Sequence, residues 1–224
     1  MSSSKLLRWS GLAAMVGYAL LAALGPINFL VLPKDVATSV AATSNAWFVT
    51  SLLGVIGLLL TLVGLVGLYA RQAEKAGTLG LIAFLVTFSG TALVYAWIWM
   101  ETFVFPLLAQ AAPRALDHPE QYSSPALLVS ALLGPLLLLV GWLLFGLASL
   151  RAGVLPRWAA VLVMVGAAVT LVLGLVGVGV PFGNNNTLAC LGLAWMGYAV
   201  WSLKGATPES IAPMTEGGPS LASR

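Results

Sequence analysis

Six apolar runs, each about 20 residues long, dominate the sequence and decide what the chain can fold into. They extend from Trp9 to Leu32, Phe48 to Ala70, Thr78 to Met100, Ala126 to Leu150, Trp158 to Val180 and Thr187 to Leu203. An α-helix needs about 20 apolar residues to cross the ~30 Å hydrocarbon core of a bilayer. Backbone groups in lipid must be hydrogen-bonded within their own segment, so such runs predict helices. We therefore predict an all-α, polytopic membrane bundle of six transmembrane helices.

The scarcity of charge excludes a soluble fold of this size. Only 8% of the 224 residues are charged and 60% are hydrophobic, whereas soluble domains carry about 25% charged residues. So few charges are not enough to cover the surface of a soluble domain, while apolar side chains are stable against lipid. The lipid bilayer is therefore the first partner that we predict.

The first apolar run shares one feature with a signal peptide, because Lys5 and Arg8 precede it. The apolar core of a signal peptide spans only about 7–15 residues and ends at a cleavage site of small residues. The run from Trp9 to Leu32 is longer and has no clear site of that kind. We interpret it as a retained first transmembrane helix.

The basic residues predict the orientation of the bundle. With the amino end inside, only Lys34 and Arg114 fall on the outer side, and the other eight fall inside: Lys5, Arg8, Arg71, Lys75, Arg151, Arg157, Lys204 and Arg224. An excess of Lys and Arg beside the spans marks the cytoplasmic side. We predict a cytoplasmic amino end at 1–8, a membrane domain at 9–204 with both ends inside, and a disordered cytoplasmic tail at 205–224.

Small residues recur at helical spacing in four of the runs. The stripes are Gly57, Thr61 and Gly64; Gly80, Ala83, Thr87 and Gly90; Gly134, Gly141 and Ala148; and Gly166, Thr170, Gly174 and Gly177. Transmembrane helices approach closely where such residues face one another. We predict tight internal packing, with Gly90 and Gly141 at close helix contacts. The alternative is that some stripes form the face of a homo-oligomer.

Three residues near the predicted outer ends of the spans form a candidate ligand site. Trp97 lies four residues before Glu101, so the two share a helix face, and an indole face beside a carboxylate suits a cationic ligand. Asn28 follows Pro26, which kinks or ends the first helix, and Pro135 acts similarly in the fourth run. Two helices broken in this way would line an outward cavity. The alternative is plain kinks and an ordinary interfacial anchor of Trp and Glu.

No set of residues indicates catalysis, a metal or a cofactor. His118 is the only histidine, and one histidine beside Asp117 and Glu120 does not make a preformed metal site. Cys190 is the only cysteine, so it forms no internal disulfide or cysteine cluster. The basic residues lie in short loops without a basic face, which argues against nucleic-acid binding. We expect a non-enzymatic protein without catalytic residues, metal, cofactor or nucleic-acid partner.

The segment from Leu143 to Gly166, LLFGLASLRAGVLPRWAAVLVMVG, resembles uncharacterised bacterial membrane proteins with six helices. These share a Leu-Pro-Arg-Trp step from an inner loop into a span, which here is Leu155 to Trp158. The segment from Gly67 to Gly80, GLYARQAEKAGTLG, is similar to their earlier inner loop. The resemblance covers about half of the chain. It implies a six-helix architecture in a bacterial cytoplasmic membrane and assigns no functional residues.

Two classes of function remain open. The first is a non-enzymatic accessory or structural subunit with a membrane-protein partner or a second copy of itself. The second is a small transporter or ligand-binding bundle with an outward-facing polar pocket, in which the turn from Asn184 to Asn186 would join Glu101 and Asn28. The sequence favours the first class, because it contains no transport signature.

Overall fold

The computed structural model describes residues 3–33, 35–121, 125–175 and 186–202, and over these residues it contains helices and no strand. The helices are α1 (Ser3–Val31), α2 (Thr38–Ala42), α3 (Asn45–Phe103), α4 (Phe105–Ala111), α5 (Pro113–Asp117), the 3-10 helix η1 (Pro119–Gln121), α6 (Pro125–Ala152), α7 (Arg157–Leu175) and α8 (Thr187–Trp201). The all-α prediction is therefore confirmed. Several predicted features lie outside the described residues: Lys34, 176–180, Asn184, Asn185, Lys204 and the tail at 205–224.

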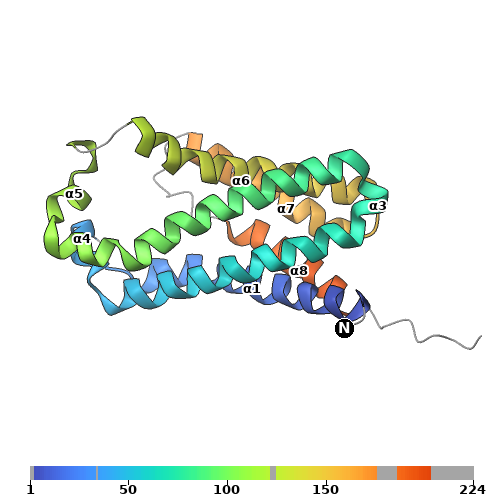
Figure 1. Cartoon of the computed structure of the whole chain (residues 1–224), viewed down its shortest axis with the longest axis horizontal. Helices are drawn as coiled ribbons and strands as arrows, with labels where there is room; N and C mark the ends of the chain where they lie inside the picture. Colours follow the sequence, from blue (N-terminus) through green and yellow to red (C-terminus); the bar gives the residue numbers. More distant parts are fainter. Residues whose placement is uncertain (1–2, 34, 122–124, 176–185, 203–224) are drawn as a thin grey trace, which may run out of the picture.

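Helix α3 consists of two arms, because the chain reverses direction at Gly77 (Figure 1). The arms, 45–76 and 78–103, contain the second and third predicted spans. Gly77 has φ 55° and ψ −146°, a conformation that glycine adopts without the steric clash of a Cβ atom. The apolar runs leave 71–77 between the second and third predicted spans, but helix continues through this segment to the residue before the turn.

The long helices are arranged as a ring. The first arm of α3 packs on α1, since a Cβ on Gly64 would lie 2.4 Å from Ala14 Cα. The second arm packs on α6, where a Cβ on Gly141 would lie 2.6 Å from Thr87 Cα. Helix α6 then contacts α7, α7 contacts α8, and α8 returns to α1. Arg8 Nε of α1 donates a hydrogen bond to the Trp201 carbonyl of α8 at 3.4 Å, beside the point where the ring closes.

Several described glycines of the predicted stripes lie at helix contacts within this ring. A Cβ on Gly90 would lie 2.3 Å from the Leu138 backbone nitrogen, and one on Gly166 would lie 2.4 Å from that of Ala189. The prediction of close contacts at Gly90 and Gly141 is therefore confirmed. Gly64, Gly90, Gly141 and Gly166 therefore lie at internal seams of the bundle.

One end of the bundle gathers basic residues, and the other carries the short helices. Arg8 lies near the start of α1, Arg71 and Lys75 precede the turn at Gly77, Arg151 lies in the last turn of α6, and Arg157 begins α7. We call this the basic end. Helices α2, α4 and α5 pack against one another at the opposite end, which we call the capped end (Figure 1).

Prolines explain why the segment between the third and fourth apolar runs contains several short helices. Pro106, Pro113, Pro119 and Pro125 each stand at the first or second position of a helix. Proline suits the start of a helix, because its fixed φ is helical and its missing N–H would be unpaired there. The segment between the first and second apolar runs also contains a helix, α2.

The described helices have the length and surface of a membrane protein. Four apolar stretches are long enough to cross a membrane: Lys5–Val31, Asn45–Phe103, Ala131–Ala152 and Arg157–Gly174. Helix α8 is equally apolar but has 15 residues. Large apolar side chains are exposed around the outside of the ring, among them Val63, Leu85, Leu136 and Val172.

Candidate ligand-binding cavity

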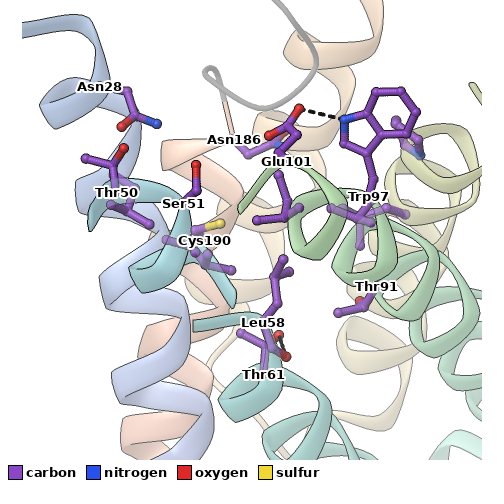
Figure 2. Close-up of a pocket in the computed structure, with 18 of the residues that line it drawn as sticks. Asn28, Thr50, Ser51, Leu58, Thr61, Thr91, Trp97, Glu101, Asn186 and Cys190 are labelled. Atoms are coloured by element: carbon purple, nitrogen blue, oxygen red, sulfur yellow. Dashed lines mark hydrogen bonds between the residues drawn. The ribbon is translucent and has the colours of Figure 1, made fainter. Parts of the chain in front are cut away.

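A cavity of about 580 Å³ occupies the half of the ring nearer the capped end. Residues of α1, both arms of α3, α6 and the start of α8 line it. Six of its polar lining residues lie toward the capped end: Asn28, Thr50, Ser51, Trp97, Glu101 and Asn186. Leucines line much of the deeper part: Leu21, Leu58, Leu138 and Leu139. The cavity is therefore amphipathic along its depth (Figure 2).

Glu101 is held in the cavity wall by two indole rings. It lies in the last turn of α3, and its side chain is half-buried. Trp97, one helical turn earlier, donates its Nε1–H to Glu101 Oε1 at 2.6 Å (Figure 2). Trp47, at the start of the first arm, donates its Nε1–H to the Glu101 carbonyl at 3.1 Å. The carboxylate thus has a fixed position, with one oxygen engaged by the protein.

Three aromatic rings form a cluster beside Glu101. The ring centroids of Trp47 and Phe105 are 6.4 Å apart with an interplanar angle of 23°. Trp97 meets Phe105 edge to face, also at 6.4 Å. We call Trp47, Trp97 and Phe105 the aromatic cluster. The faces of such rings carry partial negative charge and attract cations.

Asn28 brings α1 to the same cavity. Its Oδ1 is buried and accepts no hydrogen bond from the described residues. Helix α1 continues past Pro26 to Val31, so the proline does not end the helix. Pro26 has no N–H for the carbonyl of Ala22, and the Thr187 hydroxyl of α8 donates to that carbonyl instead, at 3.2 Å. The proline therefore creates a link between α1 and α8 at the cavity wall.

Pro135 has a related position in α6. The helix again continues through the proline, and both Pro135 and Ala131 line the cavity. Pro135 offers no N–H to the Ala131 carbonyl. Both helices in which we expected a proline effect thus line the cavity, although neither helix is broken.

The cavity is closed toward the basic end. Large side chains that are at most 1% exposed fill the ring there: Leu65, Leu68, Phe145, Leu193 and Met196. Closer to that end, Ser149 Oγ donates to Gln72 Oε1 at 2.8 Å between α6 and α3. None of these side chains lines the cavity, so among the described residues the cavity ends before the basic end.

The structure thus brings together Glu101, Trp97 and Asn28, the three residues singled out in the sequence. It adds Trp47, Thr50, Ser51, Tyr18 and Trp142, which sequence reasoning missed. Spacing within one helix links Trp97 to Glu101, whereas the added residues come from other helices or the other arm of α3. No signal in the sequence indicated which faces those helices turn inward.

Asp117, considered above only as a weak metal ligand, has a structural role. Its Oδ1 accepts the Ser39 backbone N–H at 2.9 Å, and its Oδ2 accepts the Ser39 hydroxyl at 2.8 Å. The backbone hydrogen bond from Ser39, then the one from its hydroxyl, lower the pKa of Asp117 below its ordinary value. This pair, which we call the Ser39–Asp117 clasp, joins α2 to α5 at the capped end.

Comparison with known proteins gives no relative: no family model, curated protein or solved structure matches the chain.

Proposed function

We propose that this protein is a membrane-embedded ligand-binding bundle whose cavity takes an amphiphilic organic cation. The observation that carries the proposal is the position of Glu101 beside the aromatic cluster, at the polar end of a cavity whose deeper wall contains many leucines. A carboxylate next to aromatic faces suits a substituted ammonium group. The apolar part of the cavity suits a hydrocarbon chain, because binding there removes the chain from water.

The chemistry of the cavity favours binding over the accessory role that the sequence alone favours. A purely structural subunit gains nothing from a cavity of about 580 Å³, because empty space inside a bundle forfeits packing contacts. The internal position of the glycine seams also removes one reason to assume a homo-oligomer. The closed basic end supports a binding protein or a carrier in one state rather than an open channel.

The proposal includes six membrane spans, with the basic end in the cytoplasm. Each arm of α3 is long enough to cross a bilayer by itself, and α8 completes the ring at 15 residues. Exposed Trp9 and Trp158 near the basic end, and Trp99 and Phe103 near the capped end, support two interfacial belts. On this orientation the polar end of the cavity faces the outer side of a bacterial cytoplasmic membrane.

Binding of dodecyltrimethylammonium to the full-length protein in lipid nanodiscs tests the proposed function. We expect saturable binding beyond that of empty nanodiscs, followed by quenching of tryptophan fluorescence. Dodecanol, which has the chain but no charge, should bind more weakly. Glu101→Gln should weaken binding of the cation about tenfold or more, because truncating one partner of a close charge pair leaves the other uncompensated.

Glu74→Gln is the matched control, because it removes an exposed acid on the same helix, near the basic end. It should leave the dissociation constant unchanged. Equal affinity of the wild type for the cation and for dodecanol, with no effect of Glu101→Gln, would refute the proposed function and restore the accessory-subunit hypothesis.

A further inference from the structure

Within the described part of the chain, two buried hydrogen-bond donors at the deep end of the cavity have no acceptor of good geometry. Tyr18 of α1 and Trp142 of α6 both line the cavity and are 1% and 2% exposed. Among the described residues, neither the Tyr18 hydroxyl nor the Trp142 indole N–H has a hydrogen-bond partner of acceptable geometry. The Trp142 side chain makes a weak donor interaction with the Tyr18 oxygen that falls short of hydrogen-bond geometry, and Cys190 is also close to that hydroxyl. An acceptor that reached these donors would restore the hydrogen bonds they lose when they leave water.

The surrounding residues supply few acceptors. The hydroxyls of Thr61 and Thr91, which also line the cavity, donate to the carbonyls of Leu58 and Thr87 at 2.8 Å in each case. The Cys190 thiol is a weak acceptor. Leucine side chains make up much of the remaining wall at this depth. The deep end is thus rich in donors and poor in acceptors, the opposite of the polar end, where Glu101 and Asn28 present oxygens.

We propose that the deep end is a second subsite, which binds an oxygen acceptor at the far end of the ligand. This inference rests on the proposed function, because the cationic group of the same ligand occupies the Glu101 end. Tyr18 precedes Asn28 by ten residues in α1, which is about 15 Å along a helix. The ligand class is therefore an organic cation whose apolar chain carries a carbonyl, ether or hydroxyl oxygen about 15 Å from the charge.

A pair of probes separates this inference from the proposed function. One probe is dodecyltrimethylammonium, and the other is the same molecule with a ketone oxygen near the far end of its chain. Binding of both to the full-length protein in nanodiscs is measured, with empty nanodiscs subtracted. We expect the ketone probe to bind about tenfold more tightly than the plain probe, the factor typical of one well-made buried hydrogen bond.

Two variants each remove one donor and keep an aromatic ring. Tyr18→Phe and Trp142→Phe should each bring the ratio of the two dissociation constants toward one and leave binding of the plain probe within about twofold. Either variant alone decides the question if the other fails to fold. Tyr198→Phe is the matched control, since Tyr198 belongs to α8 but is 50% exposed and does not line the cavity; it should keep the ratio.

Equal affinity of the wild type for the two probes would overturn the second subsite and leave the proposed function intact. A preference for the ketone that persists in both variants would overturn it as well. Absence of binding of the plain probe to the wild type would instead refute the proposed function, together with the subsite that rests on it.

Discussion

Glu101 illustrates what a single sequence position reveals about its surroundings. The spacing of four residues predicted that Trp97 and Glu101 share a face, and in the structure their side chains form a hydrogen bond of 2.6 Å. The contribution of Trp47 was not predictable, because it precedes Glu101 by 54 residues and reaches it only after the arms of α3 pair. The direction of the carboxylate depends on the rotation of the second arm, which neither hydropathy nor length determines.

At the same scale, the Ser39–Asp117 clasp predicts a pH dependence at the capped end. The folded-state pKa of Asp117 is lowered by its two hydrogen bonds from Ser39, so the carboxylate form stabilises the folded cap. This stabilisation is complete above the ordinary aspartate pKa of about 4 and is lost as pH falls through the lower folded-state value. Asp117→Asn should therefore speed amide exchange in α2 at neutral pH.

Hydrogen-exchange mass spectrometry of the peptide that contains 38–42 measures this effect. At about pH 3, the wild type should show part of this increase in amide exchange of α2, after correction for intrinsic exchange rates. His118→Gln serves as a control, because it changes the neighbouring residue without removing either bond to Ser39. Identical exchange in wild type and Asp117→Asn would mean that the clasp does not hold the cap.

At the scale of elements, hydropathy located the long helices but not their ends. Helix α1 begins at Ser3 rather than Trp9, and α6 runs from Pro125 to Ala152 rather than from Ala126 to Leu150. A helix can extend beyond its apolar stretch, because its end depends on how the terminal backbone N–H and C=O groups find partners and not on hydropathy. Hydropathy also did not predict that the chain reverses at the single residue Gly77, because only the backbone conformation shows it.

The seam between the second arm of α3 and α6 gives a prediction of stability. A Cβ on Gly141 would lie 2.6 Å and 2.7 Å from the Cα and N of Thr87, which are backbone atoms that cannot move aside cheaply. Gly141→Ala should therefore lower the free energy of unfolding by ~1–3 kcal/mol, as overpacking commonly does. The change should appear as a lower midpoint of thermal unfolding in detergent.

Gly54→Ala is the matched control for this seam, because its Cβ would first meet Ile98 Cγ2, a side-chain atom, at 3.3 Å. Gly54→Ala makes the same substitution in the first arm of α3, outside this seam, and should lower the midpoint of thermal unfolding much less. If both variants melt like the wild type, the two helices do not approach each other as closely as the structure has them.

At the scale of the whole molecule, the order of helices around the ring was beyond sequence reasoning. Short connections predicted that neighbours in sequence pack antiparallel, as the two arms of α3 do. No connection, however, indicated that α1 would lie between α3 and α8 or that α3 would pack on α6. Those pairings depend on small residues that match across a seam, such as Gly17 against Gly57 and Thr61, and many other pairings of glycine-rich helices satisfy the same pattern.

The orientation of the whole bundle is tested by cysteine labelling. In a Cys190→Ala background, Gln121→Cys places a thiol at the capped end and Glu74→Cys places one at the basic end, both at exposed positions. The positive-inside rule predicts that a membrane-impermeant maleimide labels Gln121→Cys in intact cells and Glu74→Cys only after permeabilisation. The reverse pattern would invert the orientation, and labelling of both in intact cells would contradict six spans.

The ring also determines when the cavity can exist during synthesis. Helix α1 packs on α8 through Gly11 and Gly197, yet α3, α6 and α7 lie between them in the chain. Until α8 has been synthesised, the ring of helices is therefore open on one side. The face of α1 that carries Gly11 then has no partner helix. The last wall, which carries Asn186 and Cys190, arrives only with α8. The cavity is thus enclosed only after α8 has docked, so a chain stalled before Thr187 would have the Glu101 side chain but no enclosed chamber.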